Sequence, residues 1–182
     1  MKVLRRTQFG NPVLRQKAKR LTADEIKSSN IQELIQNMQH TLASKKKYGV
    51  GLAAPQVGQG VAIAIIGIKP TETRPTLMHV DMVIINPKIV KTYGQKSPMW
   101  EGCISFGDTQ NFPYAKVPRY KKVRLSYDDE HGQHHEADFD GFVAHVIQHE
   151  TDHLNGVLFV DRVVDTTTYI TVAEYKKRYM HD

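Results

Sequence analysis

Gln148-His149-Glu150-Thr151-Asp152-His153 decides how this chain folds and what chemistry it carries, because two histidines stand four residues apart around a glutamate. The segment lies in a predicted helix from about Gly141 to Leu154, and residues four apart on a helix project from one face. This HExxH spacing lets both imidazoles reach one metal ion, and Glu150 then stands where it can take a proton from bound water. The rest of the predicted helix is mainly apolar, which argues against a solvated helix with two ordinary histidines.

A metal site of this kind needs a third protein ligand, and the sequence offers more than one. Proteases with the longer motif HExxHxxGxxH use a further histidine, but Phe159 occupies that position here. Glu174, on a later predicted helix, is the ligand expected of another metalloprotease group. Cys103 is the strongest candidate, since it follows a glycine that permits a close backbone approach to a ligand.

The composition indicates one ordinary globular domain. The chain has 182 residues, 40% hydrophobic and 24% charged, with a net charge of +6. The first residues are too polar for a signal peptide, and the longest apolar run, VAIAIIGI (61–68), is a buried strand rather than a membrane span. The single cysteine excludes a disulfide framework and fits a reducing compartment, so we expect a cytoplasmic location and no membrane partner.

The element pattern predicts an α+β fold. Thr22 and Glu25 have capping-box spacing and begin a long helix with an apolar face. That face is formed by Ile31, Leu34, Ile35, Met38 and Leu42. Strands are predicted at 61–68, 82–86 and 88–93, with a hairpin at 121–139 and a final helix over about 167–180. We expect small mixed or antiparallel sheets around the central histidine-bearing helix, with 1–182 forming one catalytic domain and 165–182 a helical tail.

Three segments together resemble the peptide deformylase family: GVGLAAPQ (49–56), EGCIS (101–105) and QHETDHLNG (148–156). They occur in the family's order, and the resemblance extends from about residue 3 to 163. It implies a hydrolase that removes the formyl group from N-formylmethionine at the start of new polypeptides. It also implies one divalent metal held by Cys103, His149 and His153, usually Fe²⁺, with Zn²⁺, Ni²⁺ or Co²⁺ able to take the site.

The resemblance also implies roles for other residues. Glu150 is the acid and base, while the Gln56 side-chain amide and the Ile104 backbone N–H stabilise charge on the formyl oxygen. Methionine selectivity needs an apolar pocket, to which Val50 contributes by resemblance. Residues that precede His149 on the same helix face are expected in its wall. The predicted substrate contacts are Val50, Gly51, Glu101, Gly102, Phe142, His145 and Val146.

The sequence departs from the family in its loops. The family's cysteine segment usually continues to a proline, but Phe106-Gly107-Asp108 follows here. The loops at 106–116 and 70–79 are also longer than in the common bacterial form. These differences leave the predicted ligands intact and fall on the rim that faces the substrate, where they bear on peptide preference.

The basic run Lys176-Lys177-Arg178 predicts a possible contact with ribosomal RNA through phosphates, with no role in binding DNA. Lys45-Lys46-Lys47 fits a helix end, and His131, His134 and His135 fit a solvated hairpin. Two other function classes stay open on the residues alone. One is a zinc endopeptidase that uses Glu174, and the other is a basic RNA-binding module with a purely structural metal.

Overall fold

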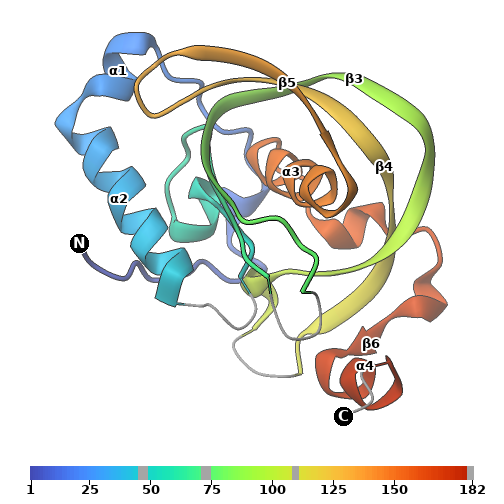
Figure 1. Ribbon diagram of the computed structural model, residues 1–182. Helices are drawn as coiled ribbons and strands as arrows, with labels where there is room; N and C mark the ends of the chain where they lie inside the picture. The colour runs from blue at the N-terminus through green and yellow to red at the C-terminus, as the bar shows by residue number, and fades with distance from the viewer. Residues whose placement is uncertain (45–48, 71–74, 108–110, 180–182) are drawn as a thin grey trace.

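The computed structural model describes residues 1–44, 49–70, 75–107 and 111–179 (Figure 1). The predicted helix end at Lys45-Lys46-Lys47 and parts of both long loops therefore lie outside the described residues. The helices are α1 (Ala23–Lys27), α2 (Ser29–Ser44), α3 (Gly141–Leu154) and α4 (Val172–Tyr179). The strands are β1 (Gly51–Ala53), β2 (Ile63–Ile68), β3 (Val80–Gly102), β4 (Pro113–Asp128), β5 (His134–Asp140) and β6 (Ile170–Thr171).

All of these strands belong to one antiparallel sheet, which confirms the antiparallel alternative and corrects the expectation of several small sheets. The order is β1-β2-β3-β4-β5, and β6 pairs with β4 off this path. β3 runs for 23 residues, where the sequence predicted only two short strands, at 82–86 and 88–93. Its pairing with β4 is interrupted by register shifts between Ile85/Lys88, Ile89/Lys91 and Tyr93/Lys96. Such bulges bend a strand, and Figure 1 shows the long β3–β4 ribbon and β5 curving around α3.

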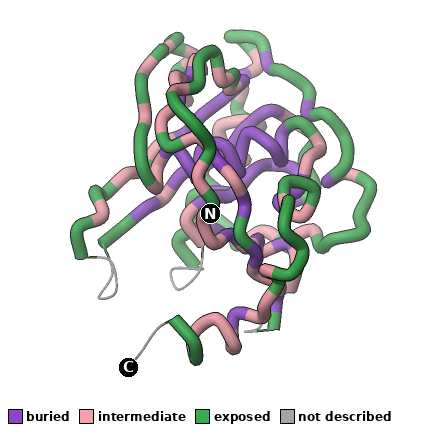
Figure 2. The backbone as a smooth tube through the Cα atoms, turned by 90° about the vertical axis from the view of Figure 1, so that its right-hand side faces the viewer, coloured by how far each residue is buried: buried purple, intermediate pink, exposed green. Residues whose placement is uncertain are grey.

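α3 is the central helix of the fold, as predicted, and its limits match the expected Gly141 to Leu154. Every residue from Ala144 to Leu154 is buried, and Figure 2 shows buried backbone concentrated at the centre of the molecule. Ile147 and Leu154 pack in one apolar cluster with side chains of β2, β3 and β4. Burial of this kind supplies most of the stability of a small domain. It also shields the polar side chains of α3 from water, so each of them needs a partner within the protein.

The predicted N-terminal helix is divided into two. Thr22 and Glu25 form the expected capping box, but Ser28 has an extended backbone (ψ 147°), so α1 ends there and α2 begins. The apolar face of α2 packs on the sheet, where Met38 joins a second cluster with Ile63 and Ile65 of β2. The capping prediction was therefore confirmed, although a single continuous helix was not.

The C-terminal segment attaches to the end of the β3–β4 ribbon. The predicted helix over about 167–180 is shorter, because Ile170–Thr171 pairs with β4 as β6 and α4 begins only at Val172. Aromatic rings hold α4 in place: Trp100 of β3 lies 5.2 Å from Tyr175 and 5.4 Å from Tyr179 between ring centroids. Lys116 of β4 places its Nζ 5.4 Å from the Trp100 ring.

No helix among the described residues has the length and apolar character needed to cross a bilayer.

Candidate metal centre

Cys103, His149 and His153 bring their ligand atoms together, all within 4.8 Å of one another. Cys103 Sγ lies 3.3 Å from His153 Nε2, which lies 3.2 Å from His149 Nε2. In a tetrahedral site with metal–nitrogen distances of about 2.0 Å and metal–sulfur distances of about 2.3 Å, ligand atoms lie roughly 3.3–3.6 Å apart. The donor set therefore fits one divalent transition metal, whose preferred ligands include thiolate and imidazole.

The three candidate ligands come from two elements. His149 and His153 project from one face of α3, as their spacing predicted. Cys103 lies between the end of β3 and the 3-10 helix η3 (Ile104–Phe106), and its thiol accepts a hydrogen bond from the Ser105 backbone N–H at 3.4 Å. All three candidate ligand residues are at least nine-tenths buried, so packing restricts the motion of their side chains.

Gln56 lies beside the thiol. It belongs to the 3-10 helix η2 (Ala54–Val57), and its Oε1 accepts from the Ala53 N–H at 2.8 Å, which fixes the orientation of the amide. Its Nε2 then faces Cys103 Sγ at 3.3 Å. The other predicted donor, the Ile104 N–H, opens η3, where a backbone donor has no partner within the helix. Gln56 and Ile104 therefore both border the candidate metal site, in the place predicted for the two donors.

Glu150 is buried, and this environment raises its pKa to about 7, chiefly by desolvation and further through the charge of Glu101. His149 and Arg119 act in the opposite direction. A carboxyl group with this pKa can hold or release a proton near neutral pH. Gly51 approaches this side chain so closely that a Cβ there would stand 2.2 Å from Glu150 Oε1. We expected Gly51 to face a substrate, but its close contact is with Glu150.

Glu101 differs from its expected role at the substrate. Its Oε1 lies 2.6 Å from His149 Nδ1 and accepts from Arg119 Nη2 at 2.8 Å, while its Oε2 accepts from Arg119 Nε at 3.1 Å. Burial opposes ionisation of this carboxyl group, yet His149, His145 and Arg119 together hold its pKa well below the ordinary value. The side chain therefore supports the ligand His149, and only the backbone of Glu101 is left for a substrate.

Gly102 and His145 also have other neighbours than expected. A Cβ on Gly102 would stand 2.3 Å from the Tyr114 ring, so the ring requires a glycine there. His145 turns its Nε2 toward Glu101 Oε2, at 2.7 Å, rather than toward an apolar pocket. The remaining three predicted pocket residues, Val50, Phe142 and Val146, do gather in one apolar cluster.

Two residues that the sequence patterns did not single out, Arg119 and Asp152, complete a buried network of charges. Arg119 Nη1 donates to Asp152 Oδ2 at 2.5 Å, and Arg162 donates to both oxygens of the same carboxylate. One signal was available in the sequence. Arg119 occupies the inward side of β4, in alternation with the buried Ala115 and Val117, and a charged residue there needs a buried partner.

Glu174, the alternative third ligand, is not part of the cluster. It lies on α4, where its carboxylate pairs with Lys177 at 3.9 Å and with Arg178 at 3.5 Å. Among the described residues, the histidine pair is therefore completed by Cys103.

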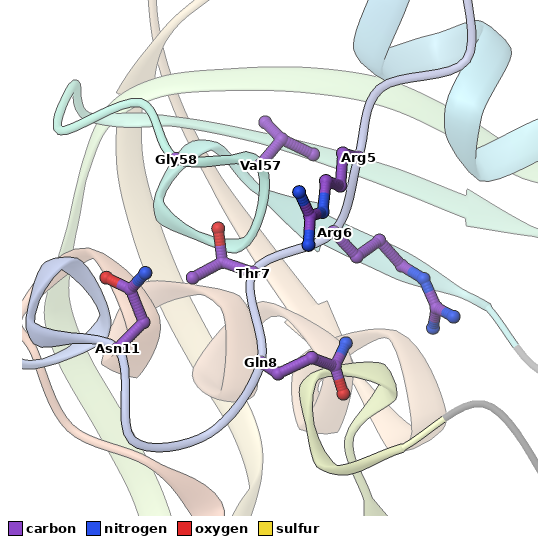
Figure 3. Close-up of a pocket in the computed structure, with 7 residues that line it drawn as sticks. All are labelled: Arg5, Arg6, Thr7, Gln8, Asn11, Val57 and Gly58. Carbon is purple, nitrogen blue, oxygen red and sulfur yellow. The ribbon is translucent and has the colours of Figure 1, made fainter.

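A separate hollow of about 560 Å³ lies along the N-terminal segment (Figure 3). Its lining residues are Arg5, Arg6, Thr7, Gln8, Asn11, Val57 and Gly58. None of the candidate ligands lines it, so it is distinct from the metal centre. Arg6 connects the two regions, because its Nη1 donates to the Ile104 carbonyl at 2.9 Å.

Comparison with known proteins gives consistent matches. Residues 3–169 match the family model described as polypeptide deformylase. Peptide deformylase 2 of a Nostoc species is 38% identical over 93% of this chain and 91% of its own length. A peptide deformylase of Leptospira biflexa is 34% identical over 93% of this chain and 92% of its own length.

Solved structures agree with the sequence matches. A Met-Ala-Ser-bound class I type b peptide deformylase from Acinetobacter baumannii superposes with a TM-score of 0.80 at 33% identity, covering 88% of this chain and 98% of that one. The enzyme from Thermotoga maritima superposes with a TM-score of 0.75 at 32% identity, covering 90% of this chain and 99% of that one.

Proposed function

Because the chain belongs to the peptide deformylase family, we propose that Cys103, His149 and His153 hold its metal ion and that Glu150 is its acid and base. The family assignment makes the protein a metal-dependent hydrolase that removes the formyl group from the N-terminal methionine of nascent peptides. The observation that carries the residue assignment is the convergence of one thiol and two imidazole nitrogens on a single point at the centre of the fold.

The ion itself supplies Lewis-acid chemistry, lowering the pKa of water and polarising a carbonyl group. From the family resemblance we infer Fe²⁺ as the native ion, with Zn²⁺, Ni²⁺ or Co²⁺ as substitutes that a thiolate and two imidazoles also accommodate. A ferrous thiolate site is sensitive to oxygen, and a free buried cysteine suits the reducing cytoplasm, which is the location we propose.

Glu150 carries the protons of the reaction. With a pKa of about 7, its carboxylate can accept a proton from the attacking water and later deliver it to the departing amine. Its Oε2 is buried without a hydrogen-bond partner among the described residues, so it is available for this exchange.

Gln56 and Ile104 act on the formyl oxygen. Negative charge develops there as the carbonyl carbon is attacked, and fixed N–H donors in a dry site stabilise that charge strongly. The Gln56 amide is oriented by the Ala53 N–H, and its Nε2 faces Cys103 Sγ and Ser105 Oγ, both at 3.3 Å, beside the candidate metal site. Val50, Phe142 and Val146 form one apolar cluster suited to a methionine side chain. Main-chain groups of Gly51, Glu101 and Gly102 would pair with the extended substrate backbone.

We also propose that residues 1–182 act as one catalytic domain, with 165–182 as a tail that can contact ribosomal RNA through Lys176, Lys177 and Arg178. Lys177 and Arg178 are exposed on α4 and share the carboxylate of Glu174, which leaves a net positive surface. Replacing the three cations with glutamine should reduce co-sedimentation with ribosomes at low salt. Unchanged co-sedimentation would contradict the proposed contact between this tail and ribosomal RNA.

The deciding experiment measures formate release from formyl-Met-Ala-Ser by protein purified without oxygen, with metal content determined on the same sample. Glu150→Gln should keep the metal and lose at least about a hundredfold in kcat. Cys103→Ala should lose the metal. Glu174→Gln is the matched control and should keep the metal and the formate release. If the protein were an endopeptidase with Glu174 as third ligand, this variant would lose its metal. Absence of formate release from fully metal-loaded protein would overturn the proposed function.

A further inference from the structure

His145 contacts Glu101, the carboxylate that supports the candidate ligand His149. It lies one helical turn before His149 on α3, and both its side chain and that of Glu101 are almost completely buried, at 5% and 4% exposure. Its Nε2 is 2.7 Å from Glu101 Oε2, while Glu101 Oε1 is 2.6 Å from His149 Nδ1. One carboxylate therefore joins the two histidines.

The proton positions follow from the chemistry of that carboxylate. Arg119 donates to both of its oxygens, so Glu101 is ionised and can only accept hydrogen bonds. His145 brings its Nε2 to 2.7 Å from Oε2, a close polar contact without hydrogen-bond alignment. His149 must donate from Nδ1 to Oε1, which leaves its lone pair on Nε2, the atom that faces Cys103 and His153.

Packing alone does not account for a histidine at position 145. Both of its ring nitrogens are buried, and neither has an aligned hydrogen-bond partner among the described residues, which costs stability. Its neighbours are apolar: the Phe142 ring stacks on the imidazole at 6.4 Å with an interplanar angle of 11°, and Val146 is buried beside it. An aliphatic side chain would suit these surroundings without the penalty. The contact that a histidine adds is the one from Nε2 to Glu101.

We propose that His145 is a positioning residue of the metal centre: by fixing one oxygen of Glu101, it keeps the other aligned with His149 Nδ1 and so directs His149 Nε2 at the metal. This inference rests on the proposed function, because it takes His149 as a ligand. It adds a residue that touches neither metal nor substrate.

The test compares Co²⁺ release from His145→Leu, His145→Gln and His135→Leu. His135 offers a matched control, since it also lies 2.7 Å from a carboxylate oxygen, on Asp129, and also stacks on an aromatic ring, that of Tyr127. It stands on the exposed β5 hairpin, away from the metal centre. Full-length protein is loaded with Co²⁺, and transfer to a chelator is followed by the cobalt–thiolate absorption band.

His145→Leu should release Co²⁺ about tenfold faster than the wild type, in line with losses caused by removing groups that orient metal ligands. Its visible spectrum should also shift. The urea stability of its metal-free form should equal or exceed that of the wild type, because two buried ring nitrogens without aligned partners are gone. His145→Gln, which keeps a donor near the Nε2 position, should restore most of the slow release. His135→Leu should match the wild type.

Other outcomes separate the two proposals. If the wild type shows no cobalt–thiolate band, the ligand assignment itself is wrong. If the band is present but His145→Leu releases Co²⁺ at the wild-type rate, the role of His145 is overturned. If His145→Leu does not fold, His145→Gln is compared with His145→Asn, whose shorter amide reaches the Nδ1 position. Equal release from these two variants would also overturn the inference.

Discussion

Two groups of ion pairs in this molecule have similar geometry and different surroundings. Behind the metal centre, Arg119 lies 2.8 Å from Glu101 and 2.5 Å from Asp152, with the three side chains 4–13% exposed. On the outer face of the sheet, Arg124 lies 2.7 Å from Asp138, with the two side chains 42% and 28% exposed. The contact distances alone would rank the two groups as equals.

Their surroundings make them unequal. On the outer face, water replaces either partner at little cost, so an exposed pair contributes little to stability. Behind the metal centre no water can replace a lost partner, and an unpaired buried charge is strongly destabilising. The inner group also orients a candidate ligand through His149 Nδ1, whereas the side chain of Asp138 pairs, among the described residues, with Tyr93, Lys122 and Arg124. The comparison teaches that burial, rather than distance, determines which ion pairs of this sheet matter to function.

The largest expected effect comes from Arg119→Met. It leaves Glu101 and Asp152 buried without their shared cation, and the free energy of unfolding should fall by about 3–5 kcal/mol. Urea denaturation of the metal-free protein measures this change. Arg124→Met, the same substitution on the outer face, should leave the urea midpoint close to that of the wild type. Equal losses from the two variants would contradict the comparison.

Glu101→Gln should have the next largest effect. The shape of the side chain is kept, but the charge that holds Arg119 and His149 is removed, and metal affinity should fall about 10- to 100-fold. Competition with a chelator, using Zn²⁺ or Co²⁺, measures the affinity. Asp138→Asn removes a carboxylate charge in the outer group and should leave metal affinity unchanged. A wild-type affinity in Glu101→Gln would show that the network has no part in holding the metal.

The smallest expected effect is the pH dependence of the outer group. Arg124, through its hydrogen bond, lowers the pKa of Asp138 below its usual value despite some desolvation, and Lys122 and Tyr93 add to this. A lowered pKa in the folded state stabilises the protein above the unfolded pKa, near pH 4, and this contribution disappears as the pH falls. The wild type should therefore have a slightly higher Tm than Asp138→Asn at neutral pH, with the difference shrinking below about pH 4. A difference that grows in acid would contradict the assigned sign.

Local patterns predicted the central part of this structure correctly. The four-residue spacing of His149 and His153 indicated one helix face, and the Thr22–Glu25 capping box marked a helix start. Both signals are contained within a single element, where the chain's own geometry decides the outcome. Cys103 was already the strongest candidate as a lone thiol after a glycine, and the family resemblance added to this, although nothing local brings residue 103 to α3.

Long-range pairing explains most of what the sequence did not reveal. The second half of β3 is polar and contains Gly94 and Pro98, a composition typical of a loop, but cross-strand pairing with β4 holds it extended. Ile170–Thr171 likewise becomes a strand only because Tyr114 and Pro113 of β4 lie beside it. Glu101 was expected at the substrate, and no local pattern revealed its pairing with Arg119, because Arg119 lies on another strand. Tertiary context overrides local propensity in each case.

The aromatic contact at the end of the β3–β4 ribbon has an optical consequence. Trp100 is the single tryptophan of the chain, and it stands beside Tyr175 and Tyr179 of α4 on one side and Lys116 on the other. Its indole emission therefore comes from one known place, three residues before Cys103. Departure of α4 would expose the ring to water and shift that emission to longer wavelength. The molecule thus carries an intrinsic fluorophore that reports the docking of its C-terminal helix without any label.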